Sequence, residues 1–312
     1  MQREKAKRFL AGALLTLMEQ KPYEKINISE ICAAAFLSRT SFYKYFPSKD
    51  ELLRYQFRTM LAPVPDHAEG SDPALYLTES LLRLPAYTRI VSEQRLLAQL
   101  LPELARLFAP ESSGADGLRQ ACAAYLSLLY AVRSAPRQRA DTIVRCWRDV
   151  YDSAPELIGT RPEQSASAPR ERNIALLAGA MRMCLEADAP LAQIHVKDLT
   201  ALAGVNRSSF YRCFSAPEEL FLYCLRERIA GDITGDAPSD RIVLDHYRGD
   251  SILVRTAWSE LGIEGFAALY TSVLNQLTDL PNDDVPGDQL YVYRLRNVCF
   301  AARRTALLYC FL

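Results

Sequence analysis

Histidine is scarce in this chain of 312 residues, and no catalytic or metal-binding motif is built on it. His67, His195 and His246 stand in no zinc, catalytic-triad or phosphate-loop pattern. The eight cysteines are scattered without a CxxC pair, which favours reduced, buried thiols over disulfides or a metal site. We therefore expect a protein that is not an enzyme and that binds no metal or cofactor.

Long apolar runs are missing as well. No run approaches the roughly 18 residues that are needed to cross a bilayer. The first residues are basic up to Arg8 and apolar over 9–18, which resembles a signal peptide, but no small-residue cleavage site follows and polar residues begin at Glu19. We expect an amphipathic first helix in a cytoplasmic protein that does not contact a membrane.

The chain also lacks a net charge, because 37 basic residues balance 37 acidic ones. A domain that neutralises DNA phosphates is expected to be basic. The charges are unevenly distributed, however: residues 1–60 hold 11 Lys and Arg against 6 Asp and Glu, and six of the seven lysines lie within the first 49 residues. Positive charge is thus concentrated where a phosphate backbone would be met.

Apolar residues recur at three-to-four spacing between prolines and glycines, and strand signals are nearly absent. The pattern predicts an all-α protein, and its length suits two or more domains. Asn27 with Glu30 forms a capping-box pattern, and Ser38 and Ser48 are expected to cap the next two helices. The expected helices near the N-terminus are about 2–20, 28–35, 39–45 and a fourth after residue 48.

An internal repeat organises the chain. Residues 28–53 align without gaps on residues 196–221, and nine of these 26 pairs are identical. A helix from about Asn173 to Ala187 precedes the second copy, and residues 159–170 are polar and rich in proline and serine, which is typical of a linker. The expected parts are a domain at 1–60 (motif 26–45), a helical segment at 61–158, the linker at 159–170, a second domain at 171–230 (degenerate motif 194–213) and a second helical segment at 231–312.

A short helix, a tight turn and a second short helix is the helix-turn-helix arrangement, whose second helix enters the major groove of DNA. The first residues of the helix at 39–45 are donors that can reach base edges, and Arg39 suits a bidentate contact with guanine. Tyr43, Lys44 and Tyr45 suit phosphate contacts, while Phe42 and Phe46 should face inward. The expected DNA-binding residues are Asn27, Ser38, Arg39, Thr40, Ser41, Tyr43, Lys44, Tyr45 and Lys49, with Arg207, Ser208, Ser209, Tyr211 and Arg212 as a weaker second set.

The segment 31–52, ICAAAFLSRTSFYKYFPSKDEL, resembles the TetR/AcrR-like transcriptional regulators. The shared pattern is a small helix that ends in Ala, a turn, a Thr/Ser-x-Tyr-x-x-Phe recognition helix, and Ser-Lys-x-x-Leu at the start of the fourth helix. The resemblance covers about 60 residues in each copy. It implies a phosphate contact for Lys49, a ligand-sensing and dimerising helical region after each reader, operator binding as a dimer, and release by a small molecule.

The second copy departs from this pattern. Pro217 stands where the first copy has Lys49, Cys213 replaces Tyr45, and His195 replaces the cap Asn27. Residues 169–230 carry 8 basic against 7 acidic residues. We expect the second copy to keep its fold and either to bind DNA weakly or to play a purely structural part.

We expect a DNA-binding regulator of transcription, ligand-responsive and a repressor; the alternative is an interaction protein that sequesters another regulator. Two arrangements are open. The chain could fold back as a pseudo-dimer, with helices around 115–133 and 136–153 on those around 262–280 and 288–311, or two chains could form a homodimer. No ligand-binding residues are assigned, because core packing is the favoured interpretation of the aromatic residues Tyr76, Tyr87, Tyr125, Tyr130, Trp147, Tyr247, Trp258 and Tyr270.

Overall fold

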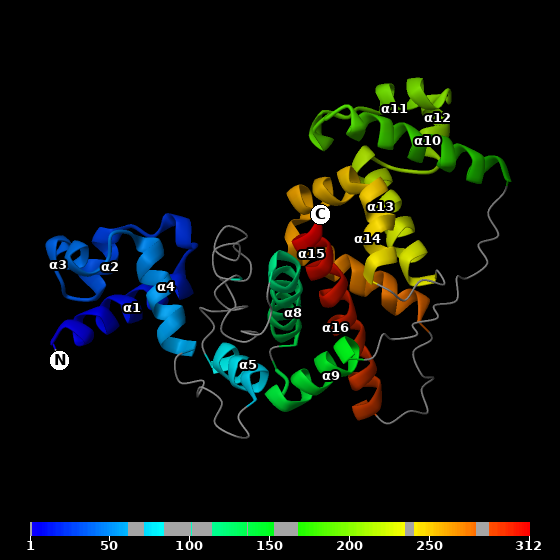
Figure 1. Ribbon diagram of the computed structural model, residues 1–312. Coiled ribbons are helices and arrows are strands. Elements are labelled where there is room, and N and C mark those ends of the chain that lie inside the picture. Colours follow the sequence, from blue (N-terminus) through cyan, green and yellow to red (C-terminus); the bar gives the residue numbers. More distant parts are fainter. Residues whose placement is uncertain are drawn as a thin grey trace. The chain divides into compact units, whose positions relative to one another are not determined.

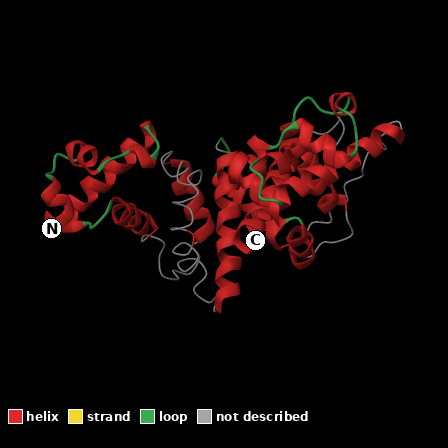
Figure 2. Cartoon of the chain, turned by 90° about the horizontal axis from the view of Figure 1, so that it is seen from above, coloured by secondary structure: helices red, strands yellow, loops and turns green. Residues whose placement is uncertain are grey.

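The computed structural model describes residues 2–61, 72–83, 101, 114–135, 137–152, 168–234, 240–278 and 287–312. These residues form helices joined by loops and contain no strand, which confirms the all-α prediction (Figures 1 and 2). The chain divides into two compact units, residues 1–147 and 148–312. None of the described helices is long and apolar enough to span a membrane.

Unit 1 begins with a small bundle, drawn in blue in Figure 1, in which α1 packs on α2 and α4. The helix α1 ends at Gln20 because Lys21 precedes a proline, which disfavours helical geometry. Leu10, Leu14 and Met18 of α1 are buried against the other helices. The elements are α1 (Gln2–Gln20), the 3₁₀ helix η1 (Tyr23–Lys25), α2 (Ile28–Ala34), α3 (Arg39–Tyr45) and α4 (Lys49–Leu61), which confirms the expected bounds to within one residue.

The rest of unit 1 contains helices of the segment that the sequence assigns to sensing and dimerisation. The helix α5 (Pro73–Arg83) packs on α8 (Gly114–Ser134), and α9 begins at Ala140 and ends at Asp152. The indole Nε1 of Trp147 donates a hydrogen bond of 2.8 Å to Oγ of Ser127, which joins α9 to α8. Tyr125, Tyr130 and Trp147 are buried, as expected of core residues, whereas Tyr87 lies outside the described residues.

Unit 2 contains a second small bundle. The helix α10 begins at Ala168, so the last three residues of the predicted linker 159–170 are helical. Pro169 is tolerated there because the first turn of a helix has no partner for its N–H groups. Residues 159–167 lie outside the described residues. The elements are α10 (Ala168–Glu186), η2 (Leu191–Gln193), α11 (Val196–Ala203), α12 (Arg207–Tyr211) and α13 (Pro217–Thr234).

Three longer helices complete unit 2: α14 (Asp240–Gly249), α15 (Ser251–Leu277) and α16 (Gly287–Phe311). The expected helix at 262–280 is the second half of α15, which kinks at Gly262, where φ is 67° and ψ is 169°. This backbone region is nearly restricted to glycine, so Gly262 explains the kink. The helix α15 packs on α13, α14 and α16, and Tyr247 and Tyr270 are fully buried in this core.

Candidate nucleic-acid interface

The first residues of α2, α3 and α4 are held by the side chains that the sequence predicts as caps. Oδ1 of Asn27 accepts the Glu30 N–H at 3.0 Å, and the Asn27 N–H donates to Oε2 of Glu30 at 2.9 Å. Oγ of Ser38 accepts the Ser41 N–H at 3.0 Å. Oγ of Ser48 accepts the N–H three residues later at 3.2 Å. Each helix start is therefore defined by a local hydrogen bond that satisfies an otherwise unpaired donor.

The helix α3 has one buried and one exposed face. Phe42 and Phe46 are 0 % and 4 % exposed, and their ring centroids lie 6.1 Å apart. Four predicted reader residues lie on the exposed face, where a bound duplex could reach them: Arg39, Thr40, Tyr43 and Lys44. The packing of the two phenylalanines thus presents the donors of α3 to solvent, which a reading helix requires.

The other predicted contacts of this domain are partly engaged within the protein. Asn27 and Ser38 serve as caps, and the hydroxyl groups of Ser38 and Ser41 lie 2.9 Å apart. Tyr45 is half-buried, and Nζ of Lys44 lies 6.0 Å from its ring centroid. These residues shape the start and end of α3, whereas the exposed donors of the helix are open to a ligand.

Lys49, for which the family resemblance implies a phosphate contact, makes several contacts within the domain. Its Nζ donates to the carbonyl oxygens of Tyr23 at 2.7 Å and Ile26 at 2.8 Å. The same nitrogen lies 4.0 Å from the centroid of the Tyr23 ring. The ammonium group is therefore held by the protein itself.

Comparison with known families bears on this domain. Residues 11–55 match the family model described as "Bacterial regulatory proteins, tetR family". The match spans α2, the turn and α3 in full, and it indicates a DNA-binding helix-turn-helix regulator of transcription. Regulators of this family generally bind DNA and are not enzymes. No curated protein matches the chain.

The second bundle lies outside the tetR-family match but has closely similar aromatic geometry. Three successive ring pairs of the first bundle have centroid distances of 5.5, 6.1 and 5.3 Å, and the aligned pairs of the second have 5.5, 6.0 and 5.5 Å. The first set is Phe42–Tyr43, Phe42–Phe46 and Phe46–Tyr55, and the second is Phe210–Tyr211, Phe210–Phe214 and Phe214–Tyr223.

The helix α12 nevertheless presents fewer donors than α3. It has 5 residues, whereas α3 has 7. Arg207, Ser208 and Tyr211 are exposed, but Ser209 is buried. Arg212 folds back on its own helix: its Nε donates to the Ser208 carbonyl at 3.3 Å and its Nη2 to Oγ of Ser209 at 2.9 Å.

The helix starts of the second bundle also differ from those of the first bundle. His195 precedes α11 without a side-chain capping hydrogen bond. Oδ1 of Asn206 accepts the Ser209 N–H at 2.7 Å, which is the role that Ser38 plays for α3. Pro217 begins α13, as expected of a residue that tolerates the first helical turn.

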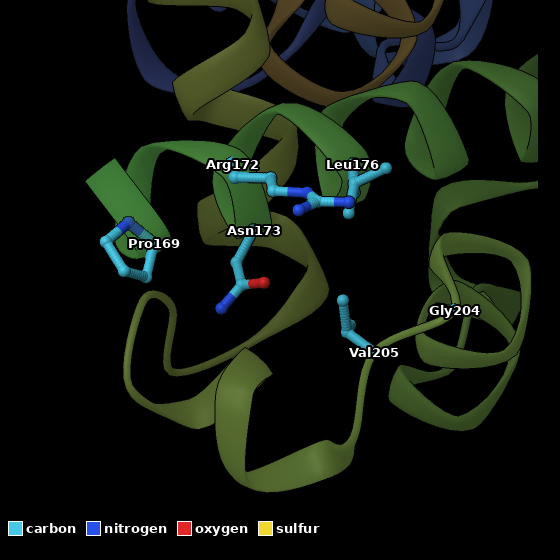
Figure 3. A pocket seen from close by; sticks show the side chains of 6 residues that line it. All are labelled: Pro169, Arg172, Asn173, Leu176, Gly204 and Val205. Atoms are coloured by element: carbon cyan, nitrogen blue, oxygen red, sulfur yellow. The ribbon is translucent and has the colours of Figure 1, made fainter. Parts of the chain in front are cut away.

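The turn before each short helix contains a left-handed residue, which sequence reasoning missed. Phe36 has a φ of 54° and is 95 % exposed, while the aligned Gly204 has a φ of 64°. Beside Gly204, a hollow of about 540 Å³ lies between α10 and the α11–α12 turn (Figure 3). Its lining residues are Pro169, Arg172, Asn173, Leu176, Gly204 and Val205. The sequence signal for the left-handed turn was Phe36, a phenylalanine at a helix end where glycine is the usual residue.

A buried polar cluster, which the sequence pattern did not predict, lies in the second helical segment. The carboxylate of Asp232 on α13 accepts a hydrogen bond from the Tyr270 hydroxyl, and Nε of Arg304 lies 4.0 Å from it. Burial, together with the charge of Asp232, raises the pKa of Tyr247 and of Tyr270 well above the usual value. The Tyr247 hydroxyl and Oγ1 of Thr305 are buried and have no hydrogen-bond partner among the described residues.

One carboxylate joins the second bundle to this segment. Asp250, which is 8 % exposed, lies 3.4 Å from Nε of Arg182 on α10 and 3.4 Å from Nε of Arg228 on α13. These ion pairs border a cleft of about 390 Å³ that α10, α13 and α15 line. Cys224 also lines this cleft, and burial raises the pKa of its thiol to about 11.

Proposed function

We propose that this protein is a ligand-responsive repressor that reads duplex DNA through α3. The observation that carries the proposal is the exposed row of donors on α3, which two buried phenylalanines hold outward within a domain that matches the tetR family. The excess of basic residues in 1–60 supports it, because phosphate neutralisation supplies much of the affinity for DNA.

Each exposed residue of α3 has a proposed part. Arg39 and Thr40 stand in the first turn of α3, the part of a recognition helix that meets base edges, and Arg39 donates to guanine. Tyr43 and Lys44 contact phosphates and set the register of the helix on DNA. Ser41 acts with Ser38 to fix the start of the helix.

The second bundle acts as a weaker reader in this proposal. Its similar aromatic geometry supports a related fold, whereas the short α12 and the hydrogen bonds of Arg212 to its own helix favour a smaller contribution to DNA affinity. Its available contacts are the exposed Arg207, Ser208 and Tyr211. Arg212 is exposed too, but a DNA contact would compete with its hydrogen bonds to the Ser208 carbonyl and Oγ of Ser209.

Two reading helices on a two-fold operator must lie about 34 to 36 Å apart. Two arrangements would meet this spacing. In the first, the tandem chain is a pseudo-dimer, whose operator would be asymmetric because α3 and α12 differ. The alternative is a homodimer that reads a palindrome with two copies of α3. Light scattering of the DNA-binding species separates the two, since the pseudo-dimer has the mass of one chain, 35.1 kDa.

We place the effector site at the polar cluster of the second helical segment. Support comes from the Tyr247 hydroxyl and Oγ1 of Thr305, because buried polar groups without partners are uncommon and suit a ligand or water. Asp250 offers a link from this segment to α10 through its two arginines. Thr305→Val should abolish the thermal shift that an effector from a metabolite library produces, and leave DNA binding intact.

The salt dependence of binding tests the DNA-binding proposal. A phosphate-driven complex loses affinity linearly on a log–log plot against salt concentration, with a slope of about −0.9 per phosphate contact. We expect a steep slope for wild-type protein on a duplex selected from random-sequence DNA. A flat response, or no selected duplex, would favour the interaction protein that sequesters another regulator.

A further inference from the structure

The contacts of Lys49 assign this residue a part that differs from a phosphate contact. Lys49 is the first residue of α4, and its ammonium reaches back to the carbonyl oxygens of Tyr23 at 2.7 Å and Ile26 at 2.8 Å. Both distances lie in the range of charge-assisted hydrogen bonds. Two of the three ammonium donors are thus used within the domain.

The electrostatics of this position favour the inward orientation. A positive charge at the N-terminus of a helix is unfavourable, because the helix dipole places positive charge there as well. The carbonyl oxygens around η1 offer negative partial charge, and the Tyr23 ring, 4.0 Å from Nζ, adds a cation–π interaction. The electrostatic energy of the ammonium is therefore lower when it turns towards η1.

Further contacts extend this link to both sides of the loop between α1 and α2. The hydroxyl of the buried Tyr23 donates to Oδ1 of Asp50 on α4 at 2.5 Å. Nζ of Lys21 donates to Oε1 of Glu30 on α2 at 2.5 Å, and Glu30 is also half of the Asn27 capping box. The loop is therefore bonded to the start of α2 and to the start of α4.

The helix α3 follows α2 and precedes α4 in the chain. The bonds of the α1–α2 loop to the starts of α2 and α4 therefore determine the orientation of α3. The second bundle has no such connection at the aligned positions, because Leu191 and Pro217 replace Tyr23 and Lys49. Leu191 is buried and Pro217 carries no side-chain donor. The second bundle thus lacks the contacts that hold η1 to the start of α4 in the first bundle.

We infer that Lys49 is a positioning residue, which clamps the start of α4 to η1 and so fixes the reading helix α3 in the geometry that distinguishes one DNA sequence from another. The inference rests on the proposed DNA binding. It predicts that loss of the ammonium affects sequence discrimination more than phosphate attraction.

The test compares Lys49→Met with Lys44→Met, since both variants remove one positive charge and Lys44 is exposed on α3. Affinity is measured against salt for a duplex selected by the wild-type chain and for a random-sequence duplex. We expect Lys49→Met to lower the affinity for the selected duplex about tenfold, and to leave the affinity for the random duplex and the salt slope nearly unchanged. Lys44→Met should lower the slope by about 0.9. If Lys49→Met lowers the slope equally and weakens both duplexes alike, Lys49 is a phosphate contact and the inference fails.

A second pair of variants separates positioning from a loss of stability. Phe57→Leu perturbs the buried side of α4 two turns away from Lys49 and should lower the melting temperature without lowering discrimination between the two duplexes. In a Tyr23→Leu background, Lys49→Met should change the affinity for the selected duplex by less than about threefold, because the clamp is already broken. Equal losses in both backgrounds would contradict the clamp.

The thermal data also separate this inference from the proposed function. Lys49→Met should lower the melting temperature and Lys44→Met should not, whether or not the chain binds DNA. A wild-type chain that binds no duplex overturns the proposed function, whereas a Lys49→Met variant with wild-type stability overturns the clamp.

Discussion

Phe36 offers a prediction whose magnitude follows from the backbone. Its φ of 54° is left-handed, a conformation that costs residues other than glycine about 1–2 kcal/mol. The side chain is 95 % exposed, so little burial is lost when it is removed. Glycine relieves the strain but increases the entropy of the unfolded chain, which costs about 0.5–1 kcal/mol. Phe36→Gly should therefore stabilise the α2–α3 region by roughly 0.5–1 kcal/mol.

Gly204 provides the mirror experiment. Its φ is 64°, and a Cβ built there meets no heavy atom within 4 Å, so Gly204→Ala introduces no clash. The backbone conformation alone then decides whether the substitution stabilises or destabilises the protein. We expect the α11–α12 region to lose about 0.5–1 kcal/mol of stability. Phe36→Ala serves as the control, because it removes the ring and keeps the strained backbone.

Hydrogen exchange of the full chain, resolved by peptides, measures both effects without assuming a single unfolding transition. A change of 1 kcal/mol alters the exchange of protected amides about fivefold. Exchange should slow in the α2–α3 peptide of Phe36→Gly and quicken in the α11–α12 peptide of Gly204→Ala. If Gly204→Ala slows exchange instead, as alanine does at ordinary helical positions, the left-handed assignment and the reasoning from it are refuted.

Other predictions concern the second unit. Asp250→Asn should destabilise it by about 2 kcal/mol, since the partly buried Arg228 loses its counter-ion; denaturation with urea checks this, and a wild-type midpoint would contradict it. Tyr247 and Tyr270 have raised pKa values in the folded state, so stability is full below about pH 10 and falls above it as unfolding lets them ionise. Because the chain holds 16 tyrosines, the signal of these two is taken as the difference in phenolate absorbance between the wild-type chain and a Tyr247→Phe/Tyr270→Phe variant. This difference should appear together with the loss of helical circular dichroism, and its appearance in a fully helical protein would refute the prediction. Iodoacetamide should alkylate Cys224 far more slowly at pH 8 than a free thiol, because its pKa is about 11.

The sequence predicted best those features that depend on neighbouring residues. The bounds of α1 and α3 follow from Pro22 and Ser38, and the capping box of α2 follows from Asn27 and Glu30. Local hydrogen bonds and proline sterics act over a few residues, so their spacing alone is informative. The inward orientation of the phenylalanines of α3 follows from helical periodicity in the same way.

Contacts between distant residues could not be predicted in this way. Lys49 binds carbonyl groups 23 and 26 residues earlier in the chain, whereas the family resemblance implied only a phosphate contact for it. Asp232 and Arg304 come from helices far apart in sequence, where charged residues usually indicate a solvated face. Pro169 and its neighbours had a linker composition but are helical, because a helix end is a weak signal in proline-rich sequence.

The central claim is that α3 reads duplex DNA, and selection from a random-sequence pool tests it most directly. The wild-type chain and Arg39→Ala are each used to enrich bound duplexes, with Lys44→Ala as the matched loss of charge on the same helix. We predict that the wild-type chain enriches one sequence, that Arg39→Ala loses about 10- to 100-fold preference at a single base pair, and that Lys44→Ala weakens all sequences alike. Equal enrichment of the same sequence by the wild-type chain and Arg39→Ala would contradict this account.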